Sequence, residues 1–171
     1  MPEFWCGAGD ILLYHRPPNL STRLIEDGER LEDPGEPEYF YHVAIALDKY
    51  TKIEANGKTV AKANIDYGKF RTFRLPFGHD AIQRGLNLVL SYEGEPYDWP
   101  LIIDDGLRYA THDLVHLPVA YIRSEERRRK VCSSLAAKDL VAVRPEWAPL
   151  LGRNSSPEDI YNVVKSFPVG A

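Results

Sequence analysis

Short apolar segments separated by turn residues characterise the first half of the chain. The segment 41–47 is nearly continuous in apolar residues and carries β-branched side chains, which is typical of a buried strand. Asn56-Gly57 is a hairpin signal between two further extended segments. Because most of the connections are short turns, we expect the strands to pair antiparallel. Strands are predicted over residues 10–15, 41–47, 51–55, 58–61 and 69–75.

In the second half of the chain, apolar residues recur at helical spacing. From 80 to 93 they fall on one helical face, and Gly94 follows where a C-terminal cap belongs. A second helix is predicted over 124–143, and a start nearer Val131 fits the pattern equally well. The Ser-Pro pair at 156–157 predicts the start of a third helix. The predicted class is α+β, with a small antiparallel sheet or barrel packed against helices.

Two segments lack a regular pattern. Residues 26–38 are acidic and broken by Pro and Gly, which predicts a surface loop after a short helix over 19–27. Residues 97–122 combine aromatic residues, the sequence Asp104-Asp105-Gly106 and an apolar run, and they predict no single element. The neighbouring carboxylates at 104 and 105 are best explained as part of a turn.

The overall composition narrows the class of protein. The chain has 171 residues, of which 44% are apolar and 27% charged, as expected for one globular domain over 1–171. Its net charge of −4 argues against a non-specific nucleic-acid binder, which needs a basic excess. No apolar run approaches the roughly 20 residues that span a bilayer, and no secretory signal is apparent. We therefore expect a protein that is cytoplasmic as synthesised, without a transmembrane segment.

A metal site is the first chemistry to consider, because His112 and His116 are four residues apart and would share one helical face. The glutamate of the His-Glu-x-x-His motif is missing, and Pro118 is unfavourable for a long helix there. Surface or structural histidines are the better explanation, so neither a metal nor a cofactor is predicted. The basic run 127–130 is likewise best explained as a solvated face.

The chain has two cysteines, Cys6 and Cys132, so at most one disulfide could form. Cys132 follows the basic run and precedes small residues and an apolar helical pattern. In the first turn of a helix, the dipole and nearby basic residues would stabilise its thiolate, which makes a cysteine nucleophilic at neutral pH. Local composition alone favours the alternative, a buried inert thiol that packs like a small apolar residue.

Two upstream residues change that balance. His42 begins the most apolar strand, where it is either a core residue with a satisfied ring or a base held on a rigid element. Glu54 lies on the next predicted strand, where the alternative is an ordinary exposed position. On neighbouring strands the two side chains can meet on one face, and a carboxylate there would orient the imidazole toward a thiol.

Six short motifs follow one another along the chain: Gly9-Asp-Ile-Leu-Leu13, His42-Val-Ala-Ile-Ala46, Ile53-Glu-Ala55, Gly94-Glu-Pro-Tyr-Asp98, Cys132-Ser-Ser-Leu135 and Ser156-Pro-Glu-Asp159. Together they resemble the permuted branch of the NlpC-type papain-like cysteine peptidase superfamily, in particular its YiiX-like group. Lecithin retinol acyltransferase is a more distant relative. The resemblance covers most of the chain.

The resemblance implies a circularly permuted papain-like fold, in which the helix that bears the cysteine packs on a small antiparallel, barrel-like sheet. In that branch the histidine strand comes first, the orienting polar residue second and the cysteine last. His42, Glu54 and Cys132 fit this order, which implies base, orienting and nucleophilic roles respectively. The resemblance also implies that Tyr97 lines the site or stabilises an oxyanion, with a packing aromatic residue as the alternative.

The predicted function is a cysteine hydrolase that cleaves an amide bond in a peptide or a peptidoglycan stem peptide. The alternatives are a lipid-directed acyl hydrolase or transferase on the same triad, and a non-catalytic structural or binding member of the fold, such as a phage tail component. The protein would reach its substrate by release to the cell wall or by assembly into a larger particle such as a virion. Because a Cys6–Cys132 bridge would consume the nucleophile, this function predicts two free thiols.

Overall fold

The computed structural model describes residues 5–15, 40–67, 70–97, 131–152 and 155–169. The predicted α+β class with an antiparallel sheet is confirmed in these ranges. Their elements, in chain order, are β1 (Ile11–Tyr14), β2 (His42–Ala46), β3 (Thr51–Ala55), β4 (Val60–Asn64), β5 (Phe70–Phe73), α2 (His79–Leu90), α5 (Cys132–Val143), the 3-10 helix η1 (Pro145–Trp147) and α6 (Pro157–Val164).

Several predictions concern residues outside the described ranges, and they stay predictions. They are the short helix over 19–27, the acidic loop 26–38, the part of segment 97–122 after Tyr97 with Asp104, Asp105, His112 and His116, the helical start over 124–130 and the basic run 127–130.

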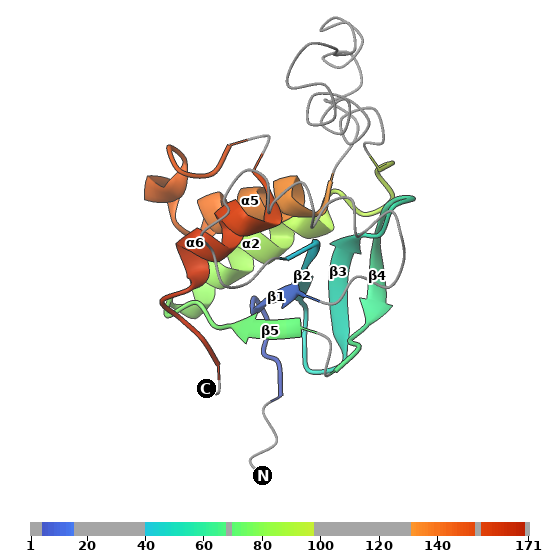
Figure 1. Cartoon of the computed structure of the whole chain (residues 1–171), viewed down its shortest axis with the longest axis horizontal. Helices are drawn as coiled ribbons and strands as arrows, with labels where there is room; N and C mark the ends of the chain where they lie inside the picture. The colour runs from blue at the N-terminus through green and yellow to red at the C-terminus, as the bar shows by residue number, and fades with distance from the viewer. Residues whose placement is uncertain (1–4, 16–39, 68–69, 98–130, 153–154, 170–171) are drawn as a thin grey trace, which may run out of the picture.

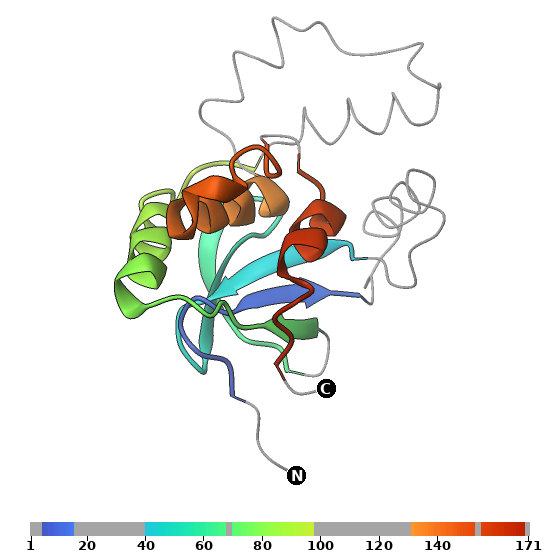
Figure 2. The same ribbon diagram turned by 90° about the vertical axis from the view of Figure 1, so that its left-hand side faces the viewer.

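Neighbouring strands of the sheet are antiparallel throughout, in the order β4-β3-β2-β1-β5. β1 therefore lies between β2 and β5, and all of its residues are buried. Figure 1 and Figure 2 show α2, α5 and α6 gathered against one face of the sheet. Short turns join β2, β3 and β4 as expected, whereas β5 returns to pair with the far side of β1.

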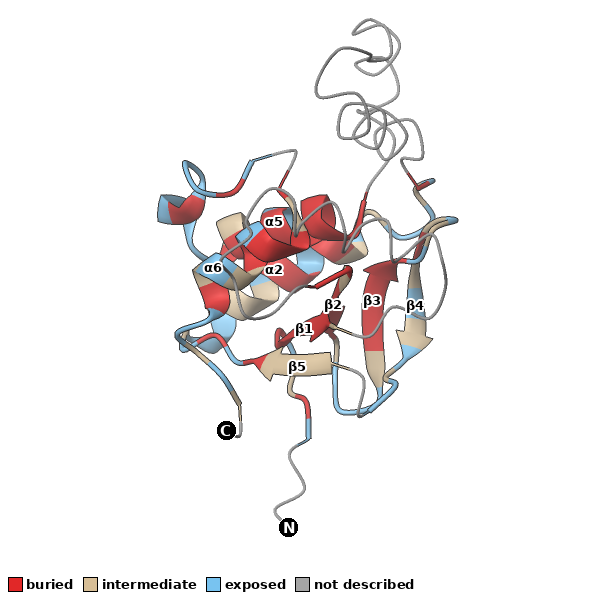
Figure 3. Ribbon diagram, in the orientation of Figure 1, coloured by how far each residue is buried: buried red, intermediate tan, exposed pale blue. Residues whose placement is uncertain are grey.

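Alternate residues of the strands contribute to two separate cores. On β1, Ile11 and Leu13 belong to a larger core shared with the helices, whereas Leu12 and Tyr14 belong to a smaller core on the other face. Figure 3 shows the buried residues of β2 and β3 together with those of α2 and α5. The centre of the sheet is thus covered on both faces, which explains why segment 41–47 is continuous in apolar residues instead of alternating.

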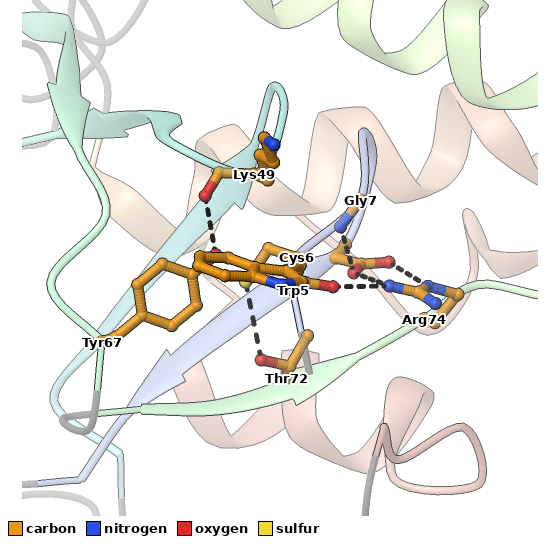
Figure 4. A network of polar contacts seen from close by, with 8 residues as sticks. Trp5, Cys6, Gly7, Lys49, Tyr67, Thr72 and Arg74 are labelled. Atoms are coloured by element: carbon orange, nitrogen blue, oxygen red, sulfur yellow. Dashed lines mark hydrogen bonds and ion pairs between the residues drawn. The ribbon is translucent and has the colours of Figure 1, made fainter. Parts of the chain in front are cut away.

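A buried carboxylate ties the segment before β1 to the end of β5. Asp10 is 2% exposed, and its two oxygens accept hydrogen bonds from the Arg74 guanidinium at 2.7 and 3.0 Å. The N–H of Gly7 donates to the same carboxylate, within the network that Figure 4 shows. Gly9 has a φ of 82°, and a Cβ there would overlap Ile82 of α2. The Gly9-Asp10 pair of the first motif therefore serves the packing of the fold.

Several element boundaries differ from the prediction by a few residues, and two of these differences have a clear cause. β4 begins at Val60 and not at residue 58, because the Asn56 side chain accepts two backbone N–H groups and extends the turn. α2 ends at Leu90, and Gly94 lies in the turn that follows, with a φ of 87°. These two differences arise from local hydrogen bonding at turns, which the apolar pattern does not record.

α2 and α5 approach each other closely at a glycine. Gly85 is buried on α2 and faces Asp139 and Val143 of α5. A Cβ at this position would overlap Oδ1 of Asp139 and lie 2.8 Å from Cγ2 of Val143. The approach therefore requires a residue without a side chain, although glycine is about 1 kcal/mol less favourable than alanine within a helix. The packing of the helix that carries Cys132 rests on this contact.

Gly85→Ala is expected to destabilise the fold. Overpacking costs roughly 1–3 kcal/mol and should exceed the gain of about 1 kcal/mol in helix propensity. Urea unfolding followed by circular dichroism measures the change in the free energy of unfolding. Gly152→Ala is the control, because a Cβ there meets no atom within 4 Å. An equal loss of stability in the two variants would contradict the close approach.

Asp139 is a buried carboxyl group in the same interface. It is 1% exposed, and neither of its side-chain oxygens has a hydrogen-bond partner within the described part of the chain. Burial raises the pKa of Asp139 from its ordinary 3.8 to about 7. The carboxyl group is therefore neutral in the folded protein under mildly acidic conditions and opposes folding once it must ionise.

Asp139→Asn is expected to change how stability depends on pH. The unfolded chain releases this proton near pH 3.8, whereas the folded chain keeps it to about pH 7. The contribution of Asp139 to stability is therefore greatest below pH 3.8 and falls by up to about 4 kcal/mol as the pH rises to 7.

Chemical unfolding of the wild type and Asp139→Asn near pH 4 and near pH 8 measures this difference. The variant should gain stability relative to the wild type at the higher pH. Asp80→Asn, which removes an exposed carboxylate from α2, is the control. If the free energies of unfolding of the wild type and Asp139→Asn differ by the same amount at both pH values, the carboxyl group is not buried and neutral as described.

Candidate active site

α5 begins at Cys132, so the later of the two predicted helix starts matches the structure. Val131 is the N-cap residue, and its N–H donates to the Ser134 hydroxyl at 3.1 Å. Valine supplies no side-chain acceptor for the first N–H groups of the helix, and the N–H of Ser133 donates to the Cys132 sulfur. The sulfur therefore lies at the positive end of the helix dipole.

The hydrogen-bonded ladder between β2 and β3 stops short of this helix start. In the described residues, the pairing ends at Ile45 and Ile53. The N–H of Leu47 donates to the carbonyl of Thr51 at the start of β3. Because every second residue of a strand directs its N–H to the same side, the N–H of Val43 also points toward β3. The N–H of Val43 donates to the Cys132 sulfur. The Val43 N–H is therefore available to the thiol and is one of the groups that lower its pKa.

His42 and Glu54 meet on one face of the sheet. Continued one residue past Ile45 and Ile53, the register sets Glu54 beside Ala44 and therefore diagonal to His42. Nε2 of His42 and Oε2 of Glu54 form a hydrogen bond of 2.8 Å. Because Nε2 faces Glu54, Nδ1 is the ring nitrogen left for Cys132, with which His42 shares a second side-chain hydrogen bond. The structure therefore brings the three residues together in the order Cys132, His42, Glu54.

The charges of these side chains stabilise one another. Burial lowers the pKa of His42, but the charge of Cys132, the hydrogen bond with it and the contact with Glu54 raise this pKa to about 9. Burial raises the pKa of the Cys132 thiol, but His42 and the backbone N–H groups of Val43 and Ser133 lower it below its ordinary value. Both directions favour a thiolate–imidazolium pair, which is the reactive form of a cysteine nucleophile.

Two residues of the site were not predicted from the sequence. Lys52 Nζ is 2.6 Å from Glu54 Oε2 and 2.8 Å from the hydroxyl oxygen of Tyr14. Burial raises the pKa of Glu54, but the bonds to His42 and Lys52 lower it to about 2. Strand periodicity could have revealed Lys52, because residues 52 and 54 share one face of β3. Tyr14 reaches the site through its pairing with His42 across β1 and β2, for which the sequence carries no signal.

Tyr97 is buried in the larger core, which also contains Cys132. Its backbone N–H donates to the carbonyl of Lys58, and Pro96 forms a bridge with Thr59, so the segment after α2 is attached to the start of β4. This placement agrees with a packing role for the ring. The oxyanion or substrate-lining role of Tyr97 stays a prediction.

The two cysteines are free, buried and located in different cores. The sulfur of Cys6 is 3.9 Å from the Thr72 hydroxyl, and its N–H donates to the Tyr67 hydroxyl, as Figure 4 shows. Cys132 lies against β2 at the start of α5. Cys6 is therefore an internal control for experiments on the thiol of Cys132.

Comparison with known proteins assigns no family to the chain. No protein-family model matches the chain, and no curated protein matches it. Within the described ranges, no group of three or more His, Cys, Asp or Glu side chains could hold a metal ion. Helices long and apolar enough to cross a membrane are also absent from those ranges.

Cys132→Ala is expected to lower the pKa of His42 by at least about one unit. The charge of Cys132 and its hydrogen bond are the main causes that raise this pKa, so their loss leaves burial opposed by Glu54 alone. NMR titration of the imidazole resonances measures the shift. His79, at the exposed start of α2, is the internal reference for the assignment of the imidazole resonances. An unchanged His42 titration would rule out the ion pair.

Proposed function

We propose that this chain is a cysteine hydrolase with a circularly permuted papain-like fold, which cleaves an amide bond in a peptide or a peptidoglycan stem peptide. The hydrogen-bonded series of Cys132, His42 and Glu54 at the start of α5 carries the proposal. The order of the elements supports it, since the strand with His42 comes first and the helix with Cys132 last. A helix that bears the cysteine and packs on an antiparallel sheet is the arrangement that the resemblance implies.

The chemistry begins with attack of the Cys132 thiolate on the substrate carbonyl carbon. The imidazolium of His42 donates its proton to the leaving amine as the C–N bond breaks, which leaves a thioester on Cys132. Neutral His42 then takes a proton from water, whose oxygen opens the thioester and releases the carboxylic acid, so that Cys132 returns as a thiolate beside the protonated His42. Glu54 holds the ring orientation and compensates the positive charge of His42 whenever it is protonated.

Two groups are candidates to stabilise the oxyanion. The backbone N–H of Cys132 is the first candidate, because an N–H in the first turn has no acceptor within the helix. The Tyr97 hydroxyl is the second. The scheme uses neither a metal nor a cofactor.

A non-catalytic structural or binding role, for example within a virion, is the second candidate function. The burial of Cys132 favours it, because only 6% of this residue is exposed. A thiol that no reagent reaches cannot attack a substrate. The hydrolase proposal therefore requires that small electrophiles reach the Cys132 sulfur in the native protein.

A thiol-alkylating probe distinguishes the two candidates. The ion pair should give rapid alkylation of Cys132 that changes little with pH down to about pH 6. Peptide mapping by mass spectrometry assigns the label to Cys132 or to Cys6. Slow labelling that follows the pH profile of an ordinary thiol would favour the non-catalytic role.

Turnover of peptide and stem-peptide substrates tests the roles of the residues. Cys132→Ala is expected to abolish hydrolysis, His42→Ala to lower kcat/KM by orders of magnitude, and Glu54→Gln to lower it less, because nucleophile and base act as a unit. Cys6→Ala is the matched control and should retain activity. Full activity in Cys132→Ala would refute the proposal. Hydrolysis of lipid esters without hydrolysis of amides would show that the substrate is a lipid ester and not a peptide.

A further inference from the structure

One carboxylate oxygen of the site lies between two basic side chains. Oε2 of Glu54 is 2.8 Å from Nε2 of His42 and 2.6 Å from Nζ of Lys52. Only 12% of the Glu54 side chain and 8% of the Lys52 side chain are exposed, so solvent and salt screen these contacts weakly. The proposed mechanism uses the charge of Glu54 for His42 and assigns no role to Lys52.

Lys52 is held firmly in this position. Its Nζ donates to the Tyr14 hydroxyl at 2.8 Å and lies 4.6 Å from the centre of the Tyr14 ring. Burial and the negative charge of Glu54 raise the pKa of Tyr14, so the hydroxyl stays protonated and accepts the bond as a neutral group. Glu54 is thus the charged partner that a buried ammonium group needs.

The elements packed around this cluster place few other titratable groups against it. In the described part of the chain they are Tyr14 of β1, Tyr41 just before β2, Cys132 of α5, Asp66 after β4 and Cys6 before β1. β4 itself places alanines opposite Lys52 and Glu54. Lys52 is therefore the cationic side chain that these elements bring to His42 and Glu54.

We propose that Lys52 is a positioning residue that shares the charge of Glu54 and thereby lowers the pH at which His42 loses its proton. This inference rests on the proposed function. The Lys52 ammonium and the His42 imidazolium are like charges hydrogen-bonded to the same oxygen of Glu54. Each therefore reduces the stabilisation that Glu54 gives to the other.

Such sharing has a consequence for both halves of the reaction. The first half needs His42 protonated, so that it can donate to the leaving amine, and the second half needs it neutral, so that it can accept a proton from water. With the whole charge of Glu54 acting on it, the imidazolium would persist to higher pH and slow the second half. By lowering the pH at which His42 loses its proton, Lys52 brings it toward the pH range in which the imidazole can both donate and accept a proton.

The pH dependence of Cys132 alkylation tests this role. For a thiolate–imidazolium pair, the profile has a lower inflection where the pair forms and an upper one where the imidazolium loses its proton. Lys52→Met removes the charge and retains much of the volume, and it is expected to move the upper inflection upward by about one pH unit. Lys52→Arg keeps the charge and should stay close to the wild type. NMR titration of His42 measures the same shift directly.

Lys62→Met is the matched control. Lys62 lies on β4 with about half of its side chain exposed and pairs with Glu93 at 2.8 Å, so its loss removes the same charge without touching the site. It should leave both inflections in place. If Lys52→Met fails to fold, Lys52→Gln takes its place, because it lacks the charge but retains N–H donors, and the same upward shift is expected.

The outcomes separate this inference from the proposed function. A wild-type protein without a reactive thiolate at low pH would refute the hydrolase, and the inference would fall with it. A wild type with both inflections, combined with charge-removing variants that leave the upper one unchanged or lower it, would refute the role of Lys52 alone.

Discussion

The first turn of α5 meets the start of β2 at Cys132, where His42 and the backbone N–H of Val43 both lower the pKa of the thiol. In the described residues the pairing of β2 with β3 stops at Ile45, so the N–H of Val43 lies beyond the ladder. Most residues of α5 are buried between the sheet and α2, so hydrophobic packing along the whole helix holds its first residue in place. Full burial of a leucine such as Leu135 or Leu140 contributes roughly 2 kcal/mol to this packing.

The smaller core lies on the face of the sheet that carries the His42 and Glu54 side chains, opposite the helices. The rings of Tyr14 and Tyr41 lie against the His42 ring, with centroids 5.3 and 6.2 Å away. Tyr14 also accepts the hydrogen bond from Lys52, so one aromatic side chain positions both the imidazole and the cation that competes for Glu54. Removing water from one side of His42 strengthens each electrostatic contact around it. The candidate site therefore depends on both cores.

Two groups in the core oppose folding. Asp139 is buried on the helix that carries Cys132 with no hydrogen-bond partner in the described residues, and Lys52 is a buried cation that needs Glu54. Neither arrangement is one that stability alone would favour, because burying polar or charged groups costs free energy. Lys52 acts on the charge of the site, and Asp139 makes the packing of α5 sensitive to pH. Conflicts of this kind tend to occur where chemistry or regulation is required.

Local signals in the sequence determined the kinds of element and the candidate residues. The apolar run of β2, the turn at Asn56-Gly57 and the cap of α6 are each encoded within a few residues, and Ser156 indeed accepts the N–H of Asp159. The order of His42, Glu54 and Cys132 is likewise a property of the chain. Only the tertiary structure decided the register that brings Tyr14 beside His42, the end of the β2–β3 ladder and the close approach of α5 to Gly85. These features depend on which faces of distant segments pack together. Because that packing is determined by the core as a whole, no local sequence pattern indicates it.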